Sequence, residues 1–150
     1  MKRWTLGLAV GCLATIPLLA AAQFAKPDDA IYYRQSAMNL MGNHVGRLGA
    51  MAQGKVPWDT KVAIENVAVV QAIHKLPFAA FGEGTDKGKT KAKPEIWADR
   101  AKFEKARDNM FANVAKLSEA AKGGQEAALK SAIGDTGAAC KNCHDDFRSR

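Results

Sequence analysis

The strongest constraint in this sequence is a short motif close to its C-terminus, Cys140-Lys141-Asn142-Cys143-His144. It reads C-x-x-C-H, the signature for covalent attachment of haem c. Residues three and four apart share one face of a helix, so a helix through the motif presents both thiols and the imidazole to one flat ligand. The thiols can add to the haem vinyl groups, and His144 can bind the iron as an axial ligand.

Two other uses of this motif have less support. A structural zinc site usually needs four nitrogen or sulfur ligands, and beyond the motif only His44 and His74 remain after the N-terminal segment described below is removed. A thioredoxin-like redox pair belongs in a βαβ unit, and the sequence shows no strand pattern. We therefore predict one haem c, attached through Cys140 and Cys143.

The N-terminus is typical of a secretory signal peptide over residues 1–22, cleaved before residue 23. Its features are the charged residues Lys2 and Arg3, a mostly apolar run from Leu6 to Leu19, and the A-x-A site Ala20-Ala21-Ala22. The apolar run is short for a membrane span and contains Pro17. Cys12 lies inside this run, so we expect it to be removed with the signal peptide. Export together with haem attachment predicts a bacterial periplasmic protein without a membrane span in its mature form.

The remaining residues, 23–150, have the length of one domain. Removing Lys2 and Arg3 from the 22 basic residues leaves 20 against 15 acidic ones, a formal charge of +5 that two haem propionates would reduce. The basic residues form no compact arginine cluster and are not interleaved with aromatic ones. The composition therefore does not predict a nucleic-acid partner.

Four helices are predicted from apolar residues at helical spacing and from prolines and glycines at the ends. They cover residues 28–53, 57–76, 94–122 and 125–148, and the last carries the haem motif. The first three should bury these stripes: Ile31, Met38, Met41, Val45 and Leu48; Val62, Val69, Val70, Ile73 and Leu76; Ile96, Phe103, Met110, Val114 and Leu117.

The connections favour an all-α fold, an antiparallel four-helix bundle with haem c attached near the C-terminus. Short breaks join the first helix to the second and the third to the fourth, which favours antiparallel neighbours. The connection over residues 77–93 is longer and contains three glycines and four lysines. Loops of that length are usually functional or disordered, and one longer connection is common in bundles.

Arg34 and Gln35 border the predicted buried face of the first helix. An unpaired charge in that position would be costly. A haem propionate would satisfy Arg34, because a guanidinium binds a carboxylate through two parallel hydrogen bonds. Alternatively, the side chain extends so that its head reaches water. The spacing alone does not distinguish these alternatives, and the haem motif favours the propionate. His44 and His74 are predicted to lie at the surface or its boundary.

The chain resembles cytochrome c′, a family of class II c-type cytochromes, over nearly the whole segment after the signal peptide. The C-terminal position of the motif, combined with the Arg34–Gln35 pair, is more specific than the motif alone. The matching stretches are 29–31, 33–37, 46–48, 55–58, 76–78, 80–82, 84–86, 92–97 and 140–145.

The resemblance implies a four-helix bundle that forms a homodimer, with thioethers at Cys140 and Cys143 and His144 on the iron. Members of the family usually hold a five-coordinate, high-spin iron. They bind nitric oxide and carbon monoxide, and are thought to carry electrons to or from a redox partner or to buffer nitric oxide. The resemblance therefore implies a protein that is not an enzyme.

The resemblance also implies further contacts around the haem. Arg34 and Gln35 match the pair that contacts haem in the family. Thr90 and Lys91 match loop positions that touch the haem edge, and Arg148 matches a basic residue near the proximal histidine. Arg148 follows His144 by four residues and so shares its helix face.

The residue on the distal side of the iron leaves two alternatives open. In the family that the chain resembles, a side chain of the first helix closes this side, and the resemblance implies that this residue is Met38 here. Some members carry methionine there without ligation, whereas a low-spin sister group uses it as the sixth ligand. The loop and C-terminal matches favour the five-coordinate alternative. A peroxidase would need a distal acid–base group, which the first helix does not offer at this position.

Overall fold

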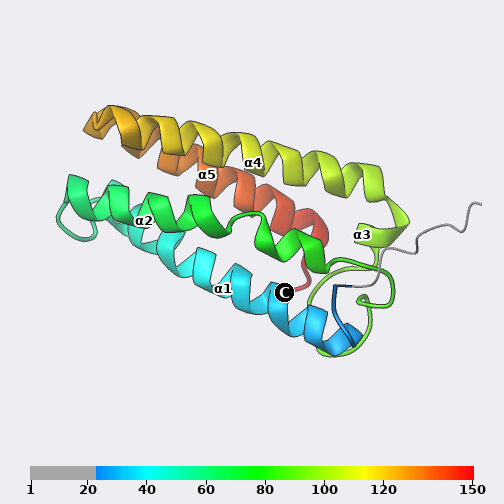
Figure 1. The fold of residues 1–150 in the computed structure, drawn as a ribbon. Helices are drawn as coiled ribbons and strands as arrows, with labels where there is room; N and C mark the ends of the chain where they lie inside the picture. The colour runs from blue at the N-terminus through cyan, green and yellow to red at the C-terminus, as the bar shows by residue number, and fades with distance from the viewer. Residues whose placement is uncertain (1–22) are drawn as a thin grey trace, which may run out of the picture.

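A computed structural model describes residues 23–150. The predicted signal peptide, residues 1–22, lies outside the described residues. Four long helices run side by side as a bundle, and the predicted all-α fold is confirmed (Figure 1). The helical elements are α1 (Pro27–Ala52), α2 (Thr60–Ile73), the 3-10 helix η1 (Leu76–Ala80), α3 (Glu95–Ala98), α4 (Arg100–Gly123) and α5 (Glu126–Phe147). None of the described helices is long and apolar enough to cross a membrane.

Local signals set most of the helix ends. α1 has Pro27 in its first turn, followed by Asp28 and Asp29, where proline fits and acids favour the positive end of the helix dipole. α4 ends at Gly124, which adopts φ 66°, a left-handed conformation that glycine adopts without steric cost.

Two predicted boundaries were wrong because aspartates cap helices at interior positions. The predicted helix over 94–122 is divided at Asp99, whose carboxylate accepts a 3.0 Å hydrogen bond from the Lys102 amide and starts α4 there. The second helix starts at Thr60 instead of residue 57, because Asp59 accepts a 3.0 Å bond from the Val62 amide. In both cases the capping oxygen satisfies an amide that has no partner within the helix.

The predicted stripes of the first and third helices lie mostly in the core. Met41 and Leu48 of α1 pack with Met110, Val114 and Leu117 of α4 in the main apolar cluster, which also includes parts of α2 and α5. A smaller aromatic cluster lies at the other end of α4. It consists of Phe81, Ile96, Phe103 and Phe147.

The predicted face of α2 was partly wrong. Val62 and Leu76 are 40% and 43% exposed, and Ala63, Asn66, Val67 and Val70 are buried instead. Alanine and asparagine were not recognised as core residues because their side chains are small or polar. Asn66 is satisfied there by His44 of α1, whose Nδ1 lies 2.8 Å from its Oδ1. His44 therefore links α1 to α2, as a boundary histidine.

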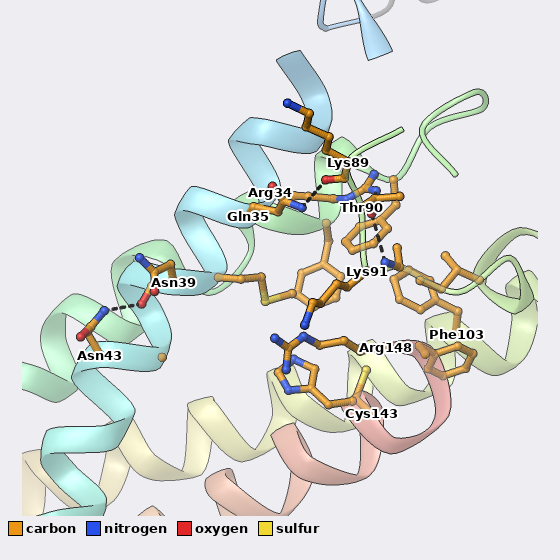
Figure 2. Close-up of a pocket in the computed structure, with 18 of the residues that line it drawn as sticks. Arg34, Gln35, Asn39, Asn43, Lys89, Thr90, Lys91, Phe103, Cys143 and Arg148 are labelled. Atoms are coloured by element: carbon orange, nitrogen blue, oxygen red, sulfur yellow. Dashed lines mark hydrogen bonds between the residues drawn. The ribbon is translucent and has the colours of Figure 1, made fainter. Parts of the chain in front are cut away.

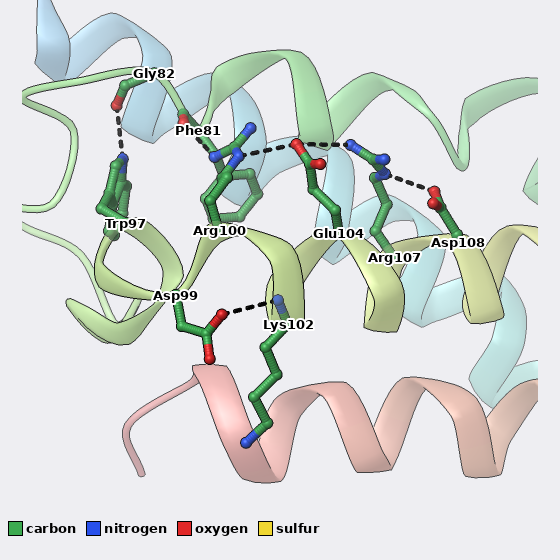
Figure 3. A network of polar contacts seen from close by, with 9 residues as sticks. All are labelled: Phe81, Gly82, Trp97, Asp99, Arg100, Lys102, Glu104, Arg107 and Asp108. Carbon is green, nitrogen blue, oxygen red and sulfur yellow. Dashed lines mark hydrogen bonds and ion pairs between the residues drawn. The ribbon is translucent and has the colours of Figure 1, made fainter.

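The long connection is folded onto the bundle. Its last residues pair with the end of α5, through a bridge between Ala92 and Arg148 and a 3.0 Å bond from the Lys93 amide to the Phe147 carbonyl. At the start of α4, Arg100 donates a 3.0 Å bond to the Phe81 carbonyl and pairs with Glu104 (Figure 3). The contacts at Ala92 and Lys93 fix the end of the connection against the end of α5.

Candidate functional site

A cavity of about 1070 Å³ opens between α1, residues 88–92 and the end of α5. It is at the large end of the range for ligand pockets. Phe78, Phe81, Ile96 and Phe103 form its apolar floor, and polar and basic side chains surround the rest (Figure 2). The fold brings together eight of the predicted site residues on its walls: Arg34, Gln35, Met38, Thr90, Lys91, Cys143, His144 and Arg148.

The haem motif lies on the last two turns of α5, which is helical from Glu126 to Phe147. Cys143 lines the cavity and packs against the aromatic cluster, while Cys140 is half-buried against the main cluster and does not line the cavity. Burial raises the pKa of Cys140, and burial together with nearby negative groups raises that of Cys143 to about 11.

His144 opens into the same cavity. Its pKa is lowered, first by desolvation and then by the positive charge of Arg148, with Asp145 acting in the opposite direction. Its imidazole is therefore neutral at pH 7, the form that binds a metal through a ring nitrogen. Together with two thiols on the same helix, it fits a covalently attached haem.

α1 forms the wall across from α5, and part of this wall has no side chains. Gly42 and Gly46 line the cavity, and a Cβ on either one would meet no atom within 4 Å. Met38 lines the same wall and packs against both apolar clusters. Among the described α1 residues on this wall, Met38 alone carries a soft donor atom suited to haem iron. The remaining space is open to a flat ligand.

Arg34 is buried, with 3% of its surface exposed, and its head does not extend to water. Its Nη1 donates to the Ala80 carbonyl (3.0 Å) and to Thr85 Oγ1 (2.8 Å). Its Nη2 donates to the Thr85 carbonyl (2.6 Å) and to Thr90 Oγ1 (2.7 Å). The guanidinium also stacks on Phe81, 4.7 Å from the ring centre. Of the five N–H donors, only that on Nε is left for a propionate, so that contact stays a prediction.

Thr90 lines the cavity beside Arg34 and is hydrogen-bonded to it. Its hydroxyl oxygen accepts from Arg34 Nη2 and also from the Ala92 amide, at 3.0 Å. With both lone pairs used, the hydroxyl hydrogen is free to donate, and Thr90 lines the cavity. Gln35 fixes the same segment through an exposed contact, because its Nε2 donates a 2.8 Å hydrogen bond to the Lys89 carbonyl. The sequence predicted Thr90 only through the resemblance. Thr85 was not predicted as a site residue.

Comparison with known proteins agrees with this geometry. The family model described as cytochrome c′ matches residues 29–148. Cytochrome c′ of Rubrivivax gelatinosus is 57% identical over 129 residues, which cover 85% of this chain and 100% of that protein. Cytochrome c′ of Alcaligenes xylosoxydans xylosoxydans is 46% identical over 128 residues, 85% of this chain and 99% of that protein.

Solved structures give the same result. The crystal structure of the Rubrivivax gelatinosus protein matches with a TM-score of 0.82 over 85% of this chain and 100% of that one, at 57% identity. A nitric oxide complex of a mutant cytochrome c prime from Alcaligenes xylosoxidans matches with a TM-score of 0.79 at 45% identity. The match covers 85% of this chain and 99% of that one. This chain belongs to the cytochrome c′ family, which binds haem c covalently through cysteines, here Cys140 and Cys143.

Proposed function

We propose that this protein is a periplasmic cytochrome c′ whose haem iron is held by His144 alone, with its sixth position open to nitric oxide and carbon monoxide, and that it also exchanges electrons. The haem supplies an iron that binds diatomic gases and changes oxidation state. Support comes from related proteins: structures of Alcaligenes xylosoxidans cytochrome c prime variants, 45% identical to this chain, contain nitric oxide or carbon monoxide.

The observation that carries the proposal is the packing of Met38. Its side chain lines the cavity that His144 also lines, yet it is held against both apolar clusters. Ligation would draw the sulfur away from those contacts, and each buried methylene lost from packing costs about 0.8 kcal/mol. Met38 then acts as an apolar gate on the distal side, which admits small uncharged gases and excludes larger ligands.

A second function is favoured by one observation about the same residue. Met38 carries the soft donor that α1 presents to the cavity containing His144. If its sulfur reaches the iron, the protein is a six-coordinate, low-spin electron carrier that binds gases poorly.

The variant Met38→Ala separates the two functions. An open sixth position predicts optical spectra of the ferric and ferrous protein that stay as in the wild type, with faster carbon monoxide binding. A ligating methionine predicts conversion from a low-spin to a high-spin spectrum. Met41→Ala is the matched control, because Met41 is buried in the main cluster and does not line the cavity.

The residues around the cavity have separate proposed roles. The thiols of Cys140 and Cys143 fix the haem, and neutral His144 binds the iron. The free hydroxyl hydrogen of Thr90 donates to a propionate, and Lys91 on the same rim supplies positive charge. Arg148, which lowers the pKa of His144, keeps a positive charge on the proximal side.

The proposal extends to location and assembly. Residues 1–22 act as a cleaved signal peptide, and residues 23–150 form the cytochrome domain. The domain forms a homodimer through exposed apolar side chains on α1 and α2, such as Tyr32, Leu40 and Ile64. It acts as an electron carrier or gas binder and not as an enzyme, in keeping with its membership of the cytochrome c′ family. N-terminal sequencing of the exported protein and its mass in solution test these points.

A further inference from the structure

Four basic side chains surround the haem cavity without acidic partners. Arg47 comes from α1, Lys89 and Lys91 from the connection, and Arg148 from the C-terminal end of α5. All four are exposed, and none is in an ion pair with a described residue. Asp28 lies beside Gly88 but forms no ion pair with Lys89. We call these four residues the basic rim.

The basic rim is held in place by the backbone. The Lys89 carbonyl accepts from Gln35 of α1, and the Lys91 carbonyl accepts a 2.8 Å bond from the Ser149 amide. The segment is thus tied to both walls of the cavity while the ammonium groups stay unpaired (Figure 2).

The positive charge exceeds what the haem needs. Two propionates would neutralise two of the four charges. A second cavity of about 490 Å³ lies on the other side of Arg148, and Lys93, Lys141 and Arg150 line it with Asp145 as the acidic residue. In contrast, four of the six lysines and arginines of α4 pair with acids, as Arg100 does with Glu104 and Lys102 with Asp146. Unpaired positive charge therefore surrounds the cavity that would hold the cofactor.

We infer that the basic rim is the docking surface for an acidic redox protein that exchanges electrons with the haem. The inference rests on the electron-exchange part of the proposed function. A ring of like charge around a cofactor mouth attracts an oppositely charged surface, raises the association rate and makes it dependent on salt. Charges drawn from three separate segments around a concave mouth suit a protein surface better than a lipid headgroup layer, which usually recognises clustered lysines and arginines on one segment.

The test compares Lys89→Glu with Lys116→Glu in the haem-loaded protein. Lys116 is exposed on α4, in no ion pair, and does not line the cavity, so it makes the same charge change elsewhere. Stopped-flow oxidation of the ferrous protein by ferricyanide is measured from 10 mM to 1 M salt. Ferricyanide carries a charge of −3, and the substitution changes the protein charge by two. At a separation of about 10 Å and near 0.1 M salt, the lost attraction slows the reaction about fivefold. The difference should vanish at 1 M and reverse with a cationic cobalt hexaammine oxidant.

Binding without electron transfer supplies the second measurement. A flavodoxin serves as the acidic protein probe, and its binding to the oxidised cytochrome is followed by amide chemical shifts. We expect shifts at residues 89–91 that Lys89→Glu weakens and Lys116→Glu does not. Equal effects of the two variants on the rate and on binding would overturn the inference. Loss of binding to phosphatidylserine vesicles in Lys89→Glu, with unchanged flavodoxin binding, would also overturn it and assign the rim to lipid.

Failure of the inference is separable from failure of the proposed function. If the protein does not react with ferricyanide even at 1 M salt, electron exchange itself is wrong. If it reacts at the same rate in both variants at every salt concentration, electron exchange stands and the basic rim plays no part in docking.

Discussion

Replacing Arg34 by methionine should destabilise the connection over residues 77–93. Methionine approximates the length of the arginine stem but has no donors, so the Thr85 carbonyl loses its buried side-chain partner and the Ala80 carbonyl keeps only a 3.5 Å contact from Thr85 Oγ1. A buried acceptor without a partner costs roughly 1–3 kcal/mol. The two together predict a loss of about 2–6 kcal/mol, in the range for removal of one partner of a buried charged network. Thr85 Oγ1 keeps its 2.8 Å bond to the Gly82 carbonyl, which limits the loss.

Urea unfolding of the haem-loaded protein, followed by circular dichroism, measures this change. Hydrogen exchange of the Thr90 and Ala92 amides shows whether the loss is local or global. Arg34→Lys should recover part of the stability, since it keeps the charge but lacks the planar fork. Gln35→Ala is the control, because it removes one exposed bond worth about 0.5–1.5 kcal/mol. An Arg34→Met variant as stable as Gln35→Ala, with unchanged exchange at Thr90, would refute the reasoning.

Three further changes test other parts of the structure. Phe103→Ala, which removes a buried ring from the floor of the cavity, should lower the free energy of unfolding by about 3–5 kcal/mol; a loss under about 1 kcal/mol would show that the aromatic cluster does not support the site. Asp99→Ala removes the N-cap of α4 and should cost about 1 kcal/mol in the same assay, and an unchanged midpoint would contradict the explanation of the helix break. His144→Ala should lose the native axial ligation, seen as a changed iron spectrum with the haem still attached; a wild-type spectrum would rule out His144 as the ligand.

The parts of the molecule that sequence predicted well depend on local chemistry. The haem motif was recognised from local spacing alone, and the family comparison confirms haem c attached through Cys140 and Cys143, while His144 as the iron ligand stays a prediction. The α4 stripe from Phe103 to Leu117 was predicted because large apolar residues repeat at one spacing, and all of its members are buried.

The parts that it missed depend on contacts between distant residues. Spacing placed Arg34 at the edge of the buried face, but its hydrogen-bond partners lie 46 to 56 residues away. Asp99 interrupts a periodic pattern that continues on both sides, so periodicity gave no sign of the break. The face of α2 was misjudged because Ala63 and Asn66 carry no strong apolar signal, and only packing against the neighbouring helices makes them core residues.

An electron paramagnetic resonance spectrum of the ferric protein, with an optical spectrum of the ferrous protein before and after nitric oxide is added, tests the open sixth position most directly. The proposed function predicts a high-spin ferric signal and prompt nitric oxide binding, with Met38 as an apolar gate. A low-spin ferric signal with little nitric oxide binding would contradict it and make Met38 the sixth ligand of an electron carrier.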